Sequence, residues 1–555
     1  MRCTYLYRWY NMPKRLTTIA RFYWRMDMQN FIQTLIERKK LINIIALLSA
    51  IAMSFMIFID LPIKRFILSL FLAAIIYFFI IFKYGFIIKT LTDTTRKYIL
   101  AAMLLALFTI GVFMLKDIRT FGTVSLVWIF AFPVISLMYL WLIKNFLPSI
   151  LDFFKNLSKT DKYYLIIKMI IMVILIAIAF SLTSVFYAPS NSEGIIDYNA
   201  IHNTDTGKII RTDAYFEYDA PQNDLRQPLF GVYGSQIAIV AKILSAPLFF
   251  IDNIYPITSA IVQVFLIELV IIMIGLLLKL KGKLKLMFSL LLSVSYPYLL
   301  FSFNMEQYVL STFWLVTFVY AAINSKKHAP YLFIGATGSM LTSGALFPLF
   351  FKDKPFKQGI IIFIKTMLTF GVLLILFGKI SIIINVFEDI VFLSHFTDKG
   401  SLTLADKLLQ YHHFIKNLVI PSHTQIAMHR DGFMSYSFII PTGFSIISAI
   451  ISVLAILGFA LNRKDSFAKT CGLWVLVSII LLCVAGWGSM ENGYILYTLY
   501  FSWAYLSLCF MALKKLIPND NILFYILLAA VVAFMVFNIP EMLKMVRFGI
   551  LHYPA

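Results

Sequence analysis

Continuous apolar runs of about 20 residues recur along almost the whole chain, and a helix needs about this length to cross the hydrocarbon of a bilayer. The runs occupy residues 41–61, 66–82, 98–115, 124–143, 165–186, 229–250, 257–278, 284–303, 306–323, 330–351, 360–377, 438–461, 471–485, 494–513 and 522–537. A transmembrane β-barrel is excluded, because its strands would alternate apolar and polar residues. With 61% hydrophobic and only 14% charged residues, the chain also lacks the polar surface of a soluble domain. The expected fold class is an all-α polytopic membrane protein.

The charge balance predicts the orientation in the membrane. Lys and Arg number 48 against 27 Asp and Glu, a net charge of +21. In a membrane protein this excess collects in cytoplasmic loops, so it does not indicate a nucleic-acid partner. With the basic first 40 residues inside, the short basic loops all face the cytoplasm if segment 330–351 enters and leaves on the same side. Its three glycines and Pro348 permit two half-helices there, provided protein covers them. One kinked span is the alternative, and it would invert everything downstream.

This topology predicts a multi-pass protein of the cell membrane with a cytoplasmic N-terminus. We expect about 13 spanning helices plus the broken or re-entrant pair, with interfacial helices in the outer loops. The expected regions are a basic cytoplasmic segment at 1–40, a four-helix membrane extension at 41–164, a membrane core at 165–378 with a first outer loop at 187–256, a second outer loop with an amphipathic helix at 379–437, and C-terminal membrane helices at 438–555.

The polar stretch from Tyr187 to Pro228 is acidic in a chain that is otherwise poor in acid. Its acidic residues are Glu193, Asp197, Asp205, Asp213, Glu217, Asp219 and Asp224. A solvated loop explains any one of them. The cluster, however, follows a helix that runs from the cytoplasm outward, so it is delivered to the outer membrane surface, and we place the candidate chemistry there.

Two patterns in this loop carry a family resemblance. DYNAIHNTDTGK occupies residues 197–208, and NDLRQPLFGVYG occupies residues 223–234. Together they resemble the polyprenol-phosphate-sugar glycosyltransferases of the GT-C superfamily, the group of the protein mannosyltransferase and aminoarabinose transferase types. In that family the first outer loop opens with D-[ED]-x-x-[YA], continues to a Gly-Asp or Gly-Lys step and ends in [KR]-x-P-L-[FY]. Tyr198 stands where the family has its second acid. The matching residues here are Asp197, Gly207, Arg226, Pro228, Leu229 and Phe230.

The resemblance implies a GT-C-like fold and an enzyme that moves a sugar from a polyprenyl-phosphate donor to a cell-envelope glycan, lipid or protein at the outer face. Asp197 is then the expected general base for the acceptor hydroxyl, with Asp205 or Asp224 as a second carboxylate. Cationic groups would stabilise the departing phosphate. The candidates for that role are Arg226, Lys242, Lys416 and Arg430. The candidates for acceptor binding or support are Glu306 and Glu491, at outer helix ends.

Structural explanations compete with several of these roles. A helix N-cap accounts for Asp197, a lysine reaching toward lipid head groups accounts for Lys242, and carboxylates at helix N-termini account for Glu306 and Glu491. The amphipathic stretch 404–419, with an apolar side formed by Leu404, Leu408, Tyr411, Ile415 and Val419, is expected to lie on the membrane. His412 and His413 are adjacent and point apart on a helix, so no metal site is assigned, and a divalent metal cofactor stays open.

Two other functions stay open. A flippase or transporter for a lipid-linked glycan would favour internal repeats and charges distributed through the spans, where Glu268 and Lys365 are the conspicuous examples. A polysaccharide polymerase would depend on outer arginines, for which Arg211, Arg226 and Arg430 are available.

Overall fold

The computed structural model describes most of the chain from residue 96 onward. The described residues are 43, 44, 47, 48, 74, 77, 96–120, 125–187, 200–202, 204, 206, 209, 225–376, 382, 385–398, 400–428, 434–438 and 443–555. The chain divides into two compact units, Met1–Asn156 and Leu157–Ala555. The division falls where helix α7 ends and Ser158 caps the next helix, slightly before residue 165, the expected start of the membrane core.

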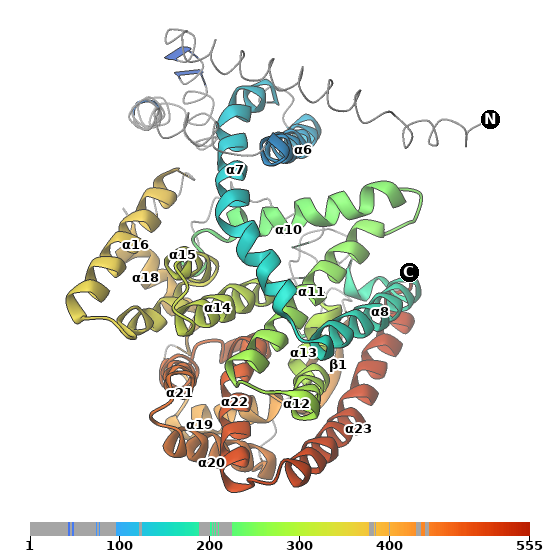
Figure 1. The fold of residues 1–555 in the computed structure, drawn as a ribbon. Helices are drawn as coiled ribbons and strands as arrows, with labels where there is room; N and C mark the ends of the chain where they lie inside the picture. Colours follow the sequence, from blue (N-terminus) through green and yellow to red (C-terminus); the bar gives the residue numbers. More distant parts are fainter. Residues whose placement is uncertain are drawn as a thin grey trace, which may run out of the picture. The chain divides into compact units, whose positions relative to one another are not determined.

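In the first unit, two long helices are described (Figure 1). They are α6 (Arg96–Thr120) and α7 (Ser125–Asn156), at the positions of the expected spans 98–115 and 124–143. They pack against each other, and the Thr109 hydroxyl lies 2.7 Å from the Tyr139 hydroxyl between them. The expected cytoplasmic segment 1–40 and the two expected spans before residue 83 lie almost wholly outside the described residues.

The second unit is built mainly of helices. Its elements before the second long loop are α8 (Lys159–Leu182), η1 (Ser184–Phe186), α10 (Phe230–Ser245), η3 (Ala246–Leu248), α11 (Ile254–Leu277), α12 (Gly282–Val294), α13 (Tyr296–Phe303), α14 (Gln307–Ile323), α15 (Ala329–Ser339), η4 (Leu341–Phe351) and α16 (Phe356–Leu376). The later elements are α18 (Val386–Leu393), η5 (Ser394–Phe396), α19 (Leu404–Asn417), β1 (Thr424–Met428), β2 (Met434–Phe438), α20 (Ile446–Leu461), α21 (Ser466–Ser478), η6 (Ile479–Val484), η7 (Met490–Tyr497), α22 (Thr498–Leu516) and α23 (Asp520–His552).

Eight helices among the described residues are long and apolar enough to cross a membrane, or nine if the bent pair α12–α13 counts as one span. The protein is therefore a helical multi-pass membrane protein, as its apolar runs predict. Helices α11 and α22 lie in the interior, whereas α8 and α23 lie at the edge, meet near their C-terminal ends and expose apolar side chains (Figure 1). Gly458 lets α20 approach α22 closely, because a Cβ there would lie 2.0 Å from the Leu508 carbonyl oxygen.

Segment 330–351 forms a pair of half-helices that returns to the end from which it starts. Helix α15 leaves the turn after α14, and η4 leads back until the Lys352 Nζ donates a 2.7 Å hydrogen bond to the carbonyl of Ile323, at the end of α14. Eleven residues of α-helix rise only about 16 Å, about half the hydrocarbon thickness. The segment therefore turns back as two short helical pieces, and its re-entry on one side of the membrane stays a prediction. We call residues 338–343 the re-entrant tip.

The expected span 284–303 is not one straight helix. Helices α12 and α13 meet at an angle of 60°, because Pro297 in the first turn of α13 cannot continue the hydrogen-bond ladder of α12. Ser295 lies at the break, and its hydroxyl donates to the Leu292 carbonyl at 2.6 Å. The freed amide of Tyr296 donates instead to the carbonyl of Val419, at 3.1 Å.

The second long loop contains a hairpin that the apolar pattern does not predict. Strands β1 and β2 pair antiparallel, with Ile426 opposite Tyr436. Residue Ile201 of the first long loop forms a parallel bridge to Tyr436 on the other side of β2. The two long loops are therefore joined through backbone hydrogen bonds, although a membrane helix bundle separates them in the sequence.

Helix α19 differs from the expected membrane-surface helix over its second half. Leu404 and Leu408 are exposed, but Tyr411 and Ile415 are buried within the protein. The Tyr411 hydroxyl lies 2.8 Å from Ser478 Oγ and also contacts the hydroxyl of Tyr505. The apolar stripe is therefore divided between an exposed face and a protein interface.

Candidate functional site

Arg226, the cation of the LRQPLF pattern, is anchored to the re-entrant tip. The amide of Leu341 donates to the Arg226 carbonyl at 2.7 Å, and the amide of Leu229 donates to the Gly338 carbonyl at 2.8 Å. Glycine is needed at position 338, because a Cβ there would lie 2.9 Å from the Cβ of Leu229. The end of the first long loop is thus hydrogen-bonded to the turn between α15 and η4.

The side chain of Arg226 lies among four aromatic residues. We call these five residues the arginine–aromatic cluster: Arg226, Tyr308, Phe396, Trp487 and Tyr497. The guanidinium lies 4.1 Å from the centre of the Phe396 ring, which stacks on Trp487 at 5.5 Å. Trp487 Nε1 donates to the Tyr497 hydroxyl at 2.5 Å, and the Tyr497 and Tyr308 rings meet at 4.9 Å. Three segments distant in sequence from Arg226 therefore contribute aromatic rings to this cluster.

Glu306, a predicted acceptor or support residue, lies beside this cluster. Both Glu306 and Arg226 interact electrostatically with the hydroxyls of Tyr308 and Tyr497. Glu306 is fully buried and caps α14, since its carboxylate accepts the amide of Gln307 at 3.0 Å. Its own amide donates to Gln263 Oε1 at 3.1 Å. The structure therefore places Arg226 and Glu306 near the same two tyrosines. The Glu306 carboxylate takes the helix-capping position that was its structural alternative.

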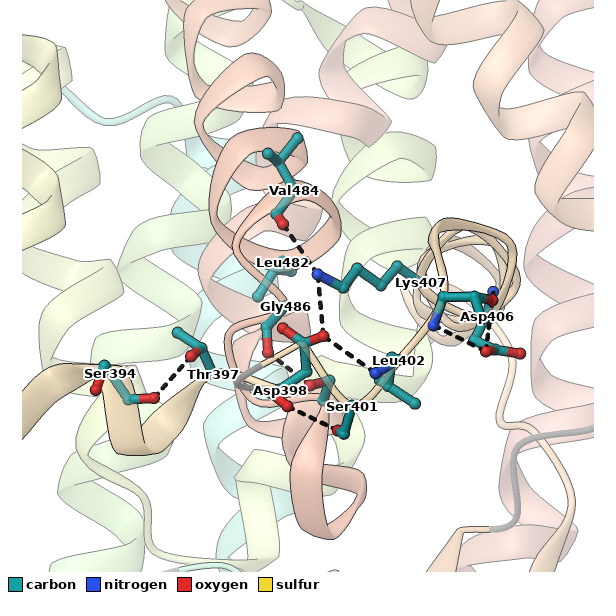
Figure 2. A network of polar contacts seen from close by, with 12 residues as sticks. Ser394, Thr397, Asp398, Ser401, Leu402, Asp406, Lys407, Leu482, Val484 and Gly486 are labelled. Carbon is teal, nitrogen blue, oxygen red and sulfur yellow. Dashed lines mark hydrogen bonds and ion pairs between the residues drawn. The ribbon is translucent and has the colours of Figure 1, made fainter.

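An ion pair lies two residues after Phe396 (Figure 2). Asp398 Oδ2 lies 3.0 Å from Lys407 Nζ, and their side chains are only 4% and 15% exposed. Burial alone would raise the pKa of Asp398, but hydrogen bonds from Lys407 and from the amides of Leu402 and Gly400 outweigh it and hold the pKa below its ordinary value. Asp398 is therefore an ionised, fully engaged carboxylate.

A second polar network joins the two long loops through His202. Its Nε2 lies 3.0 Å from the Tyr296 hydroxyl, and its ring stacks on Phe438 with the centroids 4.0 Å apart. Burial lowers the pKa of His202 to about 3, so the ring is neutral. Nearby, the Tyr436 hydroxyl donates to Glu541 at 2.5 Å.

A third cluster, which we call the buried charge cluster, lies among α8, α11 and α12 and consists of Asp161, Tyr164, Lys168, Glu268 and Lys285. Lys285 Nζ pairs with Asp161 Oδ2 at 2.7 Å, and the Tyr164 hydroxyl donates to Glu268 at 2.6 Å. Lys168 interacts electrostatically with Glu268. Glu268 thus faces protein, as a charge within a span is expected to do. Lys365, the other conspicuous charge, is exposed on α16.

Of the other predicted cations, Lys242 and Lys416 are described, and each lies in its own surroundings. Lys242 lies over the ring of Tyr255 at 5.1 Å, about 18 Å along α10 from Phe230. Lys416, near the end of α19, is half-buried, which lowers its pKa. Glu491 lies in η7, which leads directly to Tyr497, and its side chain is outside the described residues. The other four predicted residues also lie outside them: Asp197, Asp205, Asp224 and Arg430.

Metal ligation was left open by the sequence. Among the described residues no group of three or more His, Cys, Asp and Glu side chains could hold a metal ion. His412 Nε2 accepts the amide of Ser445 at 2.8 Å, whereas His413 Nε2 lies 2.9 Å from the Gly443 carbonyl. The two adjacent rings therefore anchor the start of α20 and do not converge on a common point.

Sequence reasoning did not single out Phe396, Asp398, Lys407, Trp487 or Tyr497 as parts of one site. The available signal was local: Trp487 stands between Gly486 and Gly488, both with positive φ, which is typical of a specific turn. A turn of this kind does not reveal which distant loop it contacts. No protein-family model matches the chain, and neither a curated protein nor a solved structure matches it.

Proposed function

We propose that this protein is a membrane glycosyltransferase of GT-C-like type, which moves a sugar from a polyprenyl-phosphate donor to a cell-envelope acceptor at the outer face. The observation that carries the proposal is the position of Arg226. The side chain of Arg226, in the family-like LRQPLF pattern, lies in an aromatic cluster whose two tyrosines also interact with the buried carboxylate of Glu306. The backbone of Arg226 is hydrogen-bonded to the re-entrant tip.

The chemistry of transfer from a lipid phosphate supports this role for Arg226. As the bond between the sugar and the phosphate oxygen breaks, negative charge develops on the phosphate, and a positioned cation stabilises it. A guanidinium can donate two parallel N–H bonds to phosphate oxygens. The ring of Phe396 covers one face of this planar group, so its N–H donors are aimed within the plane.

The acceptor hydroxyl must lose a proton as it bonds to the sugar, and a carboxylate receives it. We assign this role to Asp197. It stands three residues before Ala200 in the sequence, and the Ala200 carbonyl accepts the Tyr436 amide at 2.6 Å. Asp398 is a poor base in comparison, because its ion pair with Lys407 lowers its pKa.

Sugar transfer in membranes, measured with a radiolabelled polyprenyl-phosphate donor, tests the proposal. The wild-type protein is expected to label a cell-envelope acceptor, Asp197→Asn to abolish labelling, and Arg226→Ala to reduce it at least tenfold, all at equal protein levels. Glu388→Gln, which removes an exposed charge on α18, is the matched control and should retain full activity. Full activity in Asp197→Asn would overturn the base assignment, and unchanged lipid-linked sugars in a strain lacking the protein would overturn the function.

A flippase for a lipid-linked glycan is the second candidate. The observations that favour it are the bent pair α12–α13 and the re-entrant pair, since broken helices form binding sites in transporters, together with the buried charge cluster. Proteoliposomes distinguish the two functions. A flippase would move a fluorescent lipid-linked glycan across the bilayer without transferring its sugar, whereas the glycosyltransferase would transfer the sugar without moving the lipid.

A further inference from the structure

The second long loop is attached to the turn after η6 at two points. Lys407, which pairs with Asp398, donates to the Val484 carbonyl at 3.4 Å, and the amide of Gly488 donates to the Phe396 carbonyl at 2.9 Å. Figure 2 shows Asp398 between the chain turn at Ser401–Leu402 and the helical end at Val484–Gly486, with Lys407 reaching it from α19.

Gly486 shows how closely the Asp398 carboxylate fits against this turn. A Cβ at position 486 would lie 2.7 Å from Asp398 Oδ1, and Gly486 has a φ of +62°. The carboxylate also accepts the Leu402 amide at 3.3 Å. The turn therefore has no room for a side chain at position 486 beside the Asp398 carboxylate.

The ion pair of Asp398 and Lys407 lies close in sequence to a member of the arginine–aromatic cluster. Phe396, which stacks against both Arg226 and Trp487, lies two residues before Asp398 on the same loop. If the ion pair is lost, the segment around Phe396 loses its attachment through Asp398, while the Gly488 bond and the stacking on Trp487 remain. The orientation of the Arg226 guanidinium would then be less restricted.

A buried ion pair is an inefficient way to add stability, because the loss of hydration offsets much of the attraction. Such a pair is better suited to selecting one conformation of the chain, because each charge can be buried only when the other is paired with it. An ion pair at this position therefore makes one docked arrangement of the loop strongly preferred, which a layer of interchangeable apolar contacts would not do.

We propose that the Asp398–Lys407 pair is a lock that closes the second long loop over the arginine–aromatic cluster and thereby positions the Arg226 guanidinium for the donor phosphate. Asp398 and Lys407 are positioning residues in this scheme, because they act through Phe396. The part concerning the donor rests on the proposed glycosyltransferase function, whereas the closing of the loop does not.

Cys483 provides a natural reporter of the lock that needs no activity. Its side chain is 4% exposed and interacts electrostatically with Lys407. In a protein whose other three cysteines are replaced by alanine, a membrane-impermeant maleimide should label Cys483 slowly while the loop is closed. Asp398→Asn and Lys407→Met should raise the labelling rate at least tenfold. Lys407→Arg, which keeps the charge, and Glu388→Gln, which removes an unrelated charge, should leave the rate within twofold.

The second readout is donor kinetics. Asp398→Asn and Lys407→Met should raise KM for the polyprenyl-phosphate sugar about tenfold and leave kcat within threefold, and Lys407→Arg should restore the wild-type KM. Should Asp398→Asn fail to fold, the comparison of Lys407→Met with Lys407→Arg carries the same test.

Unchanged Cys483 labelling in folded Lys407→Met protein would overturn the lock. Faster labelling with an unchanged KM would overturn its role in positioning Arg226. Faster labelling in a protein that transfers no sugar even as wild type would overturn the proposed function and leave the lock standing.

Discussion

The guanidinium of Arg226 lies 4.1 Å from the centre of the Phe396 ring, and this contact joins the end of the first long loop to the second. Each partner is also fixed through its backbone, Arg226 by the amide of Leu341 and Phe396 by the amide of Gly488. The two loops and two turns of the membrane bundle therefore hold one cation in a defined orientation, which is the arrangement that phosphate recognition requires.

Replacing Arg226 by lysine should separate charge from shape. Lysine keeps the positive charge but loses the planar fork and its stacking on Phe396. We expect the dissociation constant for polyprenyl phosphate, without its sugar, to rise about tenfold in Arg226→Lys, equivalent to about 1.4 kcal/mol. Binding can be measured by microscale thermophoresis on protein in nanodiscs. Lys365→Ala, at an exposed lysine on α16, is the control, and wild-type affinity in Arg226→Lys would argue against bidentate binding.

The ion pair of Asp161 and Lys285, which joins α8 to α12, should be costly to break on one side only. Asp161→Asn leaves a buried ammonium and Lys285→Met a buried carboxylate, and each is expected to lower the free energy of unfolding by about 3–5 kcal/mol. The double variant should lose less than the sum of the two, since no charge stays unpaired. Denaturation of the protein in mixed micelles measures these values. Single variants that each cost under 1 kcal/mol would show that the pair is hydrated.

His202 should make the stability of the loop region pH-dependent. Its folded pKa of about 3 lies below the ordinary value of 6.5, so the folded state favours the neutral ring. The resulting stability is fully present above about pH 6.5 and is lost as the pH falls from there toward 3, at up to about 1.4 kcal/mol per pH unit. The Tm of His202→Asn should therefore fall less steeply over this range than that of the wild type. Asparagine suits the positive φ of 51°.

The pH dependence of the Tm in His202→Asn needs a control variant at an exposed histidine. His423→Gln provides this control, because His423 lies on the surface beside β1, and its Tm profile should follow the wild type. Identical pH profiles for His202→Asn and wild type would contradict the assignment of the acid sensitivity to His202.

Gly486→Ala should open the second long loop without removing either charge of the lock. The added Cβ would lie 2.7 Å from Asp398 Oδ1, at a φ of +62° that alanine adopts at a cost of about 1–2 kcal/mol. We expect a lower Tm and a several-fold faster labelling of Cys483. Gly371→Ala is the matched control, since a Cβ at that position in α16 meets no atom within 4 Å and should stabilise the helix slightly. Slow labelling in Gly486→Ala would show that the turn yields without moving Asp398.

Some features of the fold could be predicted from local patterns alone. The turning back of segment 330–351 is one, because its glycines permit a break and the basic residues on both sides of it leave few topologies that keep the charges together. The bend at Ser295 was missed, since Pro297 stands inside an apolar run whose hydropathy is continuous. The hairpin β1–β2 was also missed, because its two strands are short and lie in a polar loop.

The candidate site was predicted less completely than the fold. Arg226 and Glu306 were chosen for separate reasons, and only the structure brings them beside the same two tyrosines. Phe396 and Trp487 could not be chosen in the same way, because aromatic residues are abundant throughout this chain and only their contacts distinguish them. The expected base Asp197 stays a prediction, as do Asp205, Asp224 and Arg430.

By itself, the sequence determined that this chain is a helical multi-pass membrane protein, because a bilayer leaves no partner for unpaired backbone groups and an apolar run of about 20 residues can satisfy them only as a helix. The tertiary structure alone decided which polar groups meet. Asp398 and Lys407, or Asp161 and Lys285, are unremarkable where they stand in the sequence. Their pairing follows from how loops and helices pack, and charges buried in a medium of low dielectric must be paired wherever the packing places them.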